Sequence, residues 1–137
     1  MKIKYLPHTA DIRMRIEGET LEKLYMAGVK GMANIIKENS CDEPRTYNSK
    51  TRIKTSSLDN TNLLIDFLSD VLTRTYTNKT IYCKIHILSL KEYTIEADVF
   101  GVKTNDFDEE IKAVTYHEAE VKKNKNNQWV SLVIFDI

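Results

Sequence analysis

The segment WVSLVIFDI at the end of the chain most constrains the fold, because it stays apolar on both faces until a carboxylate ends it. A run of this kind is typical of a strand that lies inside a sheet and is covered on both sides. Asp136 then precedes Ile137, so a side-chain carboxylate and the terminal carboxylate follow each other. The segment predicts a central strand that carries two acidic groups to one edge of the protein.

Asp11 opens a second strand, which therefore also has a carboxylate at one end. Residues 12–17 alternate between apolar and charged side chains, which predicts a half-buried strand with Asp11 on its polar side. If the two strands are neighbours, Asp11 meets Asp136 and the Ile137 carboxylate, and this cluster repels itself unless a cation or proton neutralises it. Oxygen ligands favour calcium, magnesium or manganese. Spacing alone leaves the alternative that Asp11 caps a turn and that the terminal pair is solvated.

The period of the apolar residues indicates two helices. Residues 20–38 repeat at helical spacing behind Thr20, a good N-cap, and Gly28 and Gly31 in this helix predict close approach to a sheet. A second helix opens at Asp59 or Asn60 and carries an apolar face.

The rest of the chain reads as strands and loops. We expect a loop over 39–48, a short polar strand near 49–57, a hairpin over 80–101, and a second hairpin that joins 111–121 to the last strand through KKNKNN. Two helices with one or two sheets predict an α+β fold. The length predicts a single domain over residues 1–137, with an inserted sub-unit around 40–100 as an alternative.

Composition excludes several classes of protein. Twenty Lys and Arg balance twenty Asp and Glu, so we expect no strong direct binding to nucleic acid. No apolar run is long enough for a membrane span, and Cys41 and Cys83 have no metal-site spacing. We therefore expect two separate thiols in a cytoplasmic protein.

Other polar residues leave alternatives open. His8 and His117 could join a mixed cluster with carboxylates, or each could be a hydrogen-bonded structural imidazole. The acidic segment 104–110 could face a partner, or it could be a solvated turn. Neither cysteine has surroundings that would make it a nucleophile, and no glycine-rich phosphate loop is present in the sequence.

Four segments in order resemble the archease family across nearly the whole chain: HTADIRMRIEG, LLIDFLSDVL, IKAVTYHEAEV and VIFDI. The resemblance implies an SHS2-like α+β unit with a further small unit inserted, its two helices packed on an antiparallel or mixed sheet. It also implies a non-enzymatic accessory protein that accelerates guanylylation and turnover of the GTP-dependent tRNA-splicing RNA ligase.

The same resemblance implies roles for individual residues. Asp11, Asp136 and the carboxylate of Ile137 would bind a divalent metal, calcium first, with magnesium or manganese as alternatives. Lys112 would act in activation of the ligase, and His8 and His117 would lie beside the site.

Two rival functions follow from the residues themselves. A metal-dependent hydrolase would use the acids with a histidine, although no general base is paired with a nucleophile in the sequence. A general chaperone or protein-interaction module would use the surfaces of the hairpins.

Overall fold

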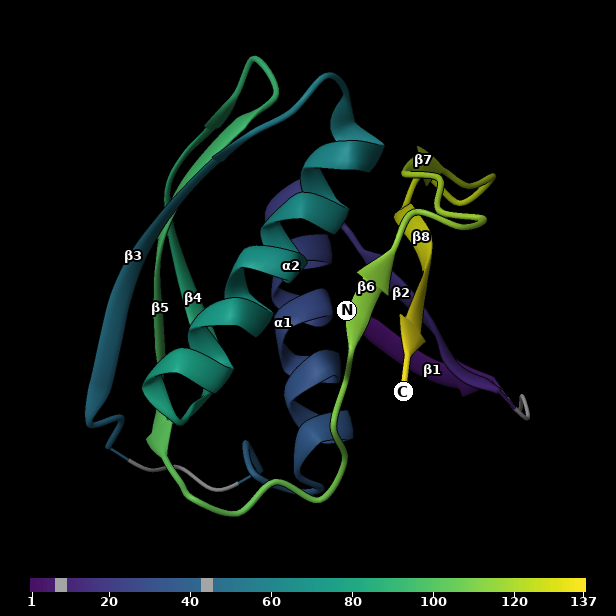
Figure 1. Cartoon of the computed structure of the whole chain (residues 1–137). Helices are drawn as coiled ribbons and strands as arrows, with labels where there is room; N and C mark the ends of the chain where they lie inside the picture. Colours follow the sequence, from purple (N-terminus) through teal and green to yellow (C-terminus); the bar gives the residue numbers. More distant parts are fainter. Residues whose placement is uncertain (7–9, 43–45) are drawn as a thin grey trace.

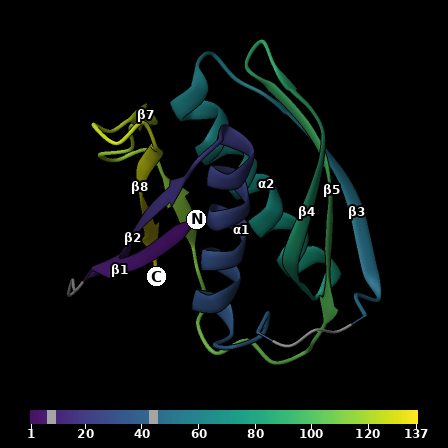
Figure 2. The same ribbon diagram turned by 180° about the vertical axis from the view of Figure 1, so that it is seen from behind.

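The protein forms three layers, in which two helices lie between two antiparallel sheets (Figures 1 and 2). The computed structural model describes residues 1–6, 10–42 and 46–137. The helices are α1 (Leu21–Ile36) and α2 (Asn60–Asn78). This arrangement confirms the predicted α+β class, and every strand pair in the described residues is antiparallel.

The first sheet joins both ends of the sequence. Its strand order is β1–β2–β8–β6, and β7 also pairs with β8. The strands are β1 (Lys2–Leu6), β2 (Asp11–Gly18), β6 (Ala113–Thr115), β7 (Lys122–Lys123) and β8 (Trp129–Asp136). Strand β8 is central, as its apolar sequence predicted, and its end lies close to β1 and β2 (Figures 1 and 2).

The second sheet comes from the middle of the chain and has the order β3–β5–β4. Its strands are β3 (Ser49–Ser56), β4 (Thr80–Lys91) and β5 (Thr94–Lys103). The β4–β5 hairpin lies where the alternating sequence predicted it. One face of this sheet packs on the helices, and the other faces outward (Figure 1).

Both helices begin at the predicted caps. The Thr20 side chain accepts a hydrogen bond from the Lys23 N–H, and the Asp59 side chain accepts one from the Asn62 N–H. Each bond satisfies an N–H that has no partner inside its helix. The helices bury their apolar faces in one hydrophobic core that both sheets share.

Gly31 allows α1 to approach the first sheet closely. A Cβ atom at this position would collide with the Met14 Sδ atom on β2, so even the smallest side chain would displace this buried methionine or push the two elements apart. At Gly28 the nearest neighbour of such an atom is the end of Leu68 on α2, at 3.2 Å. The predicted close approach to a sheet is therefore found at Gly31, which lies against β2. Gly28 lies closest to α2.

The predicted continuous strand over 111–121 is wrong. Only Ala113–Thr115 is extended and paired, and the chain then turns, with the Ala119 N–H bonded to the Tyr116 carbonyl at 3.1 Å. Glu118 has a φ of 56°, which an extended strand cannot contain. The chain does turn at KKNKNN, as predicted, but the turn connects the short β7 to β8 instead of ending a long strand.

The expectation of two separate thiols is also wrong. Cys41 and Cys83 form a disulfide, and no free cysteine remains among the described residues. The bond ties the turn after α1 to strand β4. It removes the cysteine-based argument for a reducing compartment.

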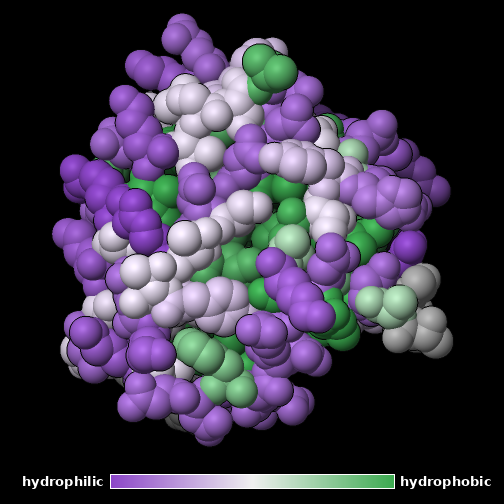
Figure 3. Space-filling view, in the orientation of Figure 1, coloured by the Kyte–Doolittle hydropathy of each residue, from purple (hydrophilic) through white to green (hydrophobic). Residues whose placement is uncertain are grey.

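The surface in Figure 3 is mostly hydrophilic, with hydrophobic atoms reaching it in smaller patches. Among the described residues, neither helix has the length and apolar character that a membrane crossing requires.

Candidate functional site

Asp11 and Asp136 face each other across two neighbouring strands. Asp11 is the first residue of β2 and Asp136 the last of β8, and the two are direct partners in the antiparallel register. Side chains at opposed positions leave the same face of a sheet, with Cβ atoms about 4.5–5.5 Å apart. The sheet therefore brings together two carboxylates from opposite ends of the sequence, and Ile137 follows directly.

Strand β6 adds Lys112 to this edge. Ala113 pairs with Asp136 on the other side of β8. The Lys112 N–H donates to the Asp136 carbonyl at 2.7 Å, which fixes the backbone of Lys112 beside the acidic residue. The Lys112 side chain is exposed. The structure thus fixes the backbone of Lys112 beside Asp136 and leaves its side chain exposed, and a lysine ammonium group can contact an anion or an acidic partner.

A chain of charged groups runs from Asp11 toward His117. Arg13 lies with its Nε 3.5 Å from Asp11 Oδ1 and its Nη1 3.2 Å from Glu118 Oε2. The same Glu118 oxygen is 3.2 Å from Nε2 of His117, whose side chain is largely exposed. The sequence left open a mixed cluster of His117 with carboxylates, but it did not predict the turn that positions Glu118, because residues 111–121 were read as a strand.

Asp11 also lines an acidic groove of about 510 Å³. The groove lies between the end of the first sheet, the last turn of α1 and the acidic segment, and its lining is Tyr5, Leu6, Asp11, Ile12, Asn34, Ile35, Glu38, Asp108 and Glu109. The acidic segment is held there because the N–H groups of Asp108 and Glu109 donate to the Ile36 carbonyl, at 2.8 and 3.3 Å. These bonds satisfy a carbonyl that helix α1 leaves unpaired.

The donor atoms at this edge suit a hard cation. The side chains of Asp11 and Asp136 offer only oxygen, the ligand that calcium, magnesium and manganese prefer. Across the described residues, no three side chains of His, Cys, Asp or Glu gather closely enough to hold a metal by themselves. Water, a partner or the predicted carboxylate of Ile137 would have to complete the shell. His8 lies outside the described residues, so its predicted place beside the site stays a prediction.

A second polar cluster joins two of the segments that carried the family resemblance. The Tyr116 hydroxyl donates to Asp66 Oδ1 on α2, and Ser57 donates to the other oxygen of Asp66. The hydrogen bond to Asp66 raises the pKa of the Tyr116 hydroxyl, and partial desolvation adds to the effect. This cluster was not predicted, because a strand through Tyr116 would not have turned its ring toward α2.

Comparison with known families matches residues 4–137 to the archease protein family. The chain belongs to the archease family. Proteins named archease from Methanosarcina mazei and Methanosarcina barkeri are 31% and 32% identical to it. The alignments cover 99% and 98% of this chain and 96% and 94% of the relatives.

Solved structures give the same fold for this archease chain. The solution structure of Methanobacterium thermoautotrophicum protein 1598 superposes with a TM-score of 0.74 at 21% identity, covering 98% of both chains. The crystal structure of a Thermotoga maritima archease, described as a possible chaperone, superposes with a TM-score of 0.63 at 20% identity and covers 100% of this chain and 98% of the other.

Proposed function

We propose that this protein is an accessory factor that activates the tRNA-splicing RNA ligase by presenting a divalent cation from its acidic edge. One observation carries the proposal: Asp11 and Asp136 are opposed in register on neighbouring strands, and Asp11 lines an acidic groove. Two facing carboxylates repel each other, so a cation bound between them would lower the free energy of the folded sheet. The archease names of the relatives support an accessory role.

Each residue at the edge has a part in this proposal. Asp11, Asp136 and the Ile137 terminus would hold the cation, and Arg13 would keep the Asp11 carboxylate oriented while the site is empty. Lys112 would contact a phosphate or an acidic residue of the ligase. A divalent ion at this place would offset the charge that develops on the nucleotide phosphates during guanylylation of the ligase. The protein itself would contribute position and charge, with no nucleophile of its own.

The proposal implies a cytoplasmic protein. It is tested by single-turnover guanylylation of the cognate ligase, with radiolabelled GTP and manganese. We expect the wild-type protein to accelerate the step. Asp136→Asn should reduce the acceleration by at least about tenfold, the loss seen even for groups that only support a metal ligand.

Glu120→Gln is the matched control, because Glu120 is an exposed acid on the same side of the first sheet that pairs only with Lys122 among the described residues. It should retain full acceleration. Equal acceleration by wild type and Asp136→Asn would refute the metal-bearing edge. No acceleration by any form would refute the role in ligation altogether.

A second candidate function is protection of unrelated proteins from aggregation. It is favoured by three large side chains that stay exposed near the Asp66 cluster and the β4–β5 turn: Leu58, Tyr93 and Tyr116. Leu58 is 86% exposed, and it lines one pocket together with Asp66 and Tyr116. If this function is the main one, Leu58→Ser should lower protection of a heat-denatured client, whereas Asp136→Asn should leave it unchanged.

A further inference from the structure

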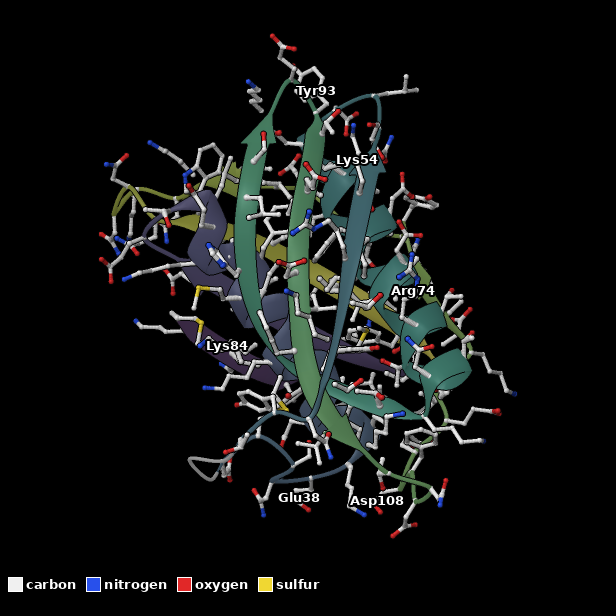
Figure 4. All side chains as sticks on the ribbon, turned by 90° about the vertical axis from the view of Figure 1, so that its left-hand side faces the viewer. Glu38, Lys54, Arg74, Lys84, Tyr93 and Asp108 are labelled. Atoms are coloured by element: carbon white, nitrogen blue, oxygen red, sulfur yellow. A yellow bond between two sulfur atoms is a disulfide. The ribbon has the colours of Figure 1, made fainter. Side chains whose placement is uncertain are left out.

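The outward face of the β3–β5–β4 sheet carries the strongest concentration of positive charge that the proposed function does not use. Strand β3 alternates so that Lys50, Arg52 and Lys54 all point away from the helices, and β4 adds Lys84 and His86 to the same face. Figure 4 shows this face toward the viewer, with Lys54 on β3 and Lys84 on β4. Within the described residues, no helix or strand covers it.

Among the described residues, the only carboxylates on this face are Glu96 and Asp98, which both lie on the middle strand β5. Asp98 is nearly buried and accepts two hydrogen bonds from Arg52, at 2.9 and 3.2 Å, with Lys50 at 3.7 Å. These contacts offset the charge of Asp98 and hold the guanidinium group of Arg52 against its carboxylate. Four permanent cations against two carboxylates leave the face with a charge of about +2, rising when His86 is protonated.

An aromatic ring lies among these cations. Phe100 on β5 is partly exposed, and the ammonium groups of Lys50 and Lys84 lie 5.8 and 5.9 Å from its ring centroid, one from each neighbouring strand. Arg74 reaches the edge of β3 from α2, through bonds to the Thr51 hydroxyl and the Arg52 carbonyl. The face therefore combines an uncovered sheet, spaced cations and an aromatic ring.

The acidic groove lies away from this face. Glu38 and Asp108, which line the acidic groove, stand at one end of the molecule in Figure 4, beyond the ends of the strands. The balanced composition hides this separation, so the zero net charge that argued against nucleic-acid binding says little about this face.

We propose that the outward face of β3–β5–β4 binds single-stranded RNA, with phosphates on Lys50, Arg52 and Lys84 and a base stacked on Phe100. Alternate residues of a strand are about 6.6 Å apart, a spacing comparable to that of successive phosphates along an extended strand. Open sheets that stack bases on aromatic side chains between basic residues are a recurrent way to hold unpaired nucleotides. The choice of RNA over DNA rests on the proposed function, which places the protein beside an RNA ligase.

Direct binding tests this proposal without any ligase. Fluorescence anisotropy would follow a labelled oligouridine of about 12 nucleotides, within the range that single small folds cover. We expect a Kd between about 1 and 100 μM, weakening with salt at a slope of about −0.7 for each phosphate contacted. The double variant Lys50→Gln/Lys84→Gln should bind about tenfold more weakly or worse and show a shallower salt slope. Phe100→Leu should weaken binding about tenfold with the slope unchanged.

Lys2→Gln/Lys125→Gln is the matched control, because it removes two exposed cations from the other sheet and its turn. It should bind like the wild type, and melting curves establish that all forms are folded. Equal binding by the wild type and the Lys50/Lys84 variant would overturn the proposal. So would equally tight binding of poly-glutamate, which would point to an acidic protein instead.

The ligase assay separates this inference from the proposed function. If the Lys50/Lys84 variant loses acceleration of guanylylation but the wild type binds no RNA, the face meets the ligase itself and the RNA proposal is refuted while the proposed function stands. If the wild type binds RNA through this face but does not accelerate guanylylation, the proposed function fails and the RNA surface stands.

Discussion

Asp11 and Asp136 occupy directly opposed positions on hydrogen-bonded strands, where two negative charges destabilise the sheet. Arg13 offsets part of this repulsion, since its Nε lies 3.5 Å from the Asp11 carboxylate. The remaining repulsion is the free energy that a bound cation would recover. Removing one acid should therefore have opposite effects with and without metal.

Asp136→Asn tests this change of sign. In EDTA the variant should be as stable as the wild type or more stable by up to about 1 kcal/mol, because one of two opposed charges is gone. With calcium at a hundredfold excess over its Kd, the wild type should gain about 2.7 kcal/mol and the variant much less. Urea denaturation in both conditions measures this, and an equal gain by both proteins would argue against the site.

Asp98 makes stability depend on pH in a predictable direction. The hydrogen bonds from Arg52 hold the pKa of Asp98 below its ordinary value of 3.8, although desolvation opposes them. A lowered pKa in the folded state stabilises the protein above about pH 4, and this contribution is lost as the pH falls through the folded-state pKa. The difference in free energy of unfolding between the wild type and Asp98→Asn should therefore be larger at pH 7 than at pH 3.

Glu96→Gln serves as the control for this experiment, since Glu96 lies on the same strand and face. Its difference from the wild type should change much less between the two pH values. A pH-independent difference for Asp98→Asn would mean that Arg52 does not hold this carboxylate ionised.

At the scale of elements, the packing of α1 on β2 rests on two glycines that behave differently. Gly31 lies against Met14, whereas the neighbours of Gly28 are the flexible ends of Leu68 and Ile16. A methyl group at Gly31 must move a strand of the first sheet or displace a buried methionine. A methyl group at Gly28 asks only for small shifts of side chains.

Gly31→Ala should destabilise the protein by about 1–3 kcal/mol, the usual cost of overpacking a core. Alanine favours the helix by up to about 1 kcal/mol over glycine, so the loss would come in spite of better helix propensity. Gly28→Ala is the matched control and should be close to neutral. Thermal or urea denaturation of both variants decides between them, and equal losses would show that helix contacts with β2 are not the tighter ones.

Much of the element order could be predicted from local signals. Thr20 and Asp59 mark the starts of both helices, and alternation marks the β4–β5 hairpin, because caps and periodicity depend on near neighbours in the chain. The strand through 116–121 could not be predicted correctly. Its sequence alternates like a strand, but Tyr116 bonds to Asp66 on α2, a contact that no local pattern contains.

At the scale of the whole molecule, α1 and α2 pack between the two sheets, and one disulfide adds a covalent link. The Cys41–Cys83 disulfide spans a sequence separation of 42 and joins the turn after α1 to the second sheet. The sequence offered no spacing that pairs these cysteines, because the approach of β4 to the end of α1 is a property of the three-layer arrangement. For the same reason, the sequence predicts the meeting of Asp11 and Asp136 only on the condition that their two strands are neighbours.

Reduction of this disulfide should lower the free energy of unfolding by about 2–4 kcal/mol, because it releases a long loop in the unfolded chain. Urea denaturation with and without a phosphine reductant measures the loss. A Cys41→Ser/Cys83→Ser variant should have the same free energy of unfolding as the reduced protein, and the reductant should not change it. Two reactive thiols in the denatured, unreduced protein would contradict the bond.

The central place of β8 in the first sheet also bears on how the protein is made. Strand β8 is synthesised after every other described element, yet it must insert between β2 and β6. A nascent chain therefore carries β1 and β2 as an incomplete sheet with an open edge, and pairing so distant in sequence is slow. The acids meet only when this last step is complete, so a prematurely terminated chain could not imitate the finished protein.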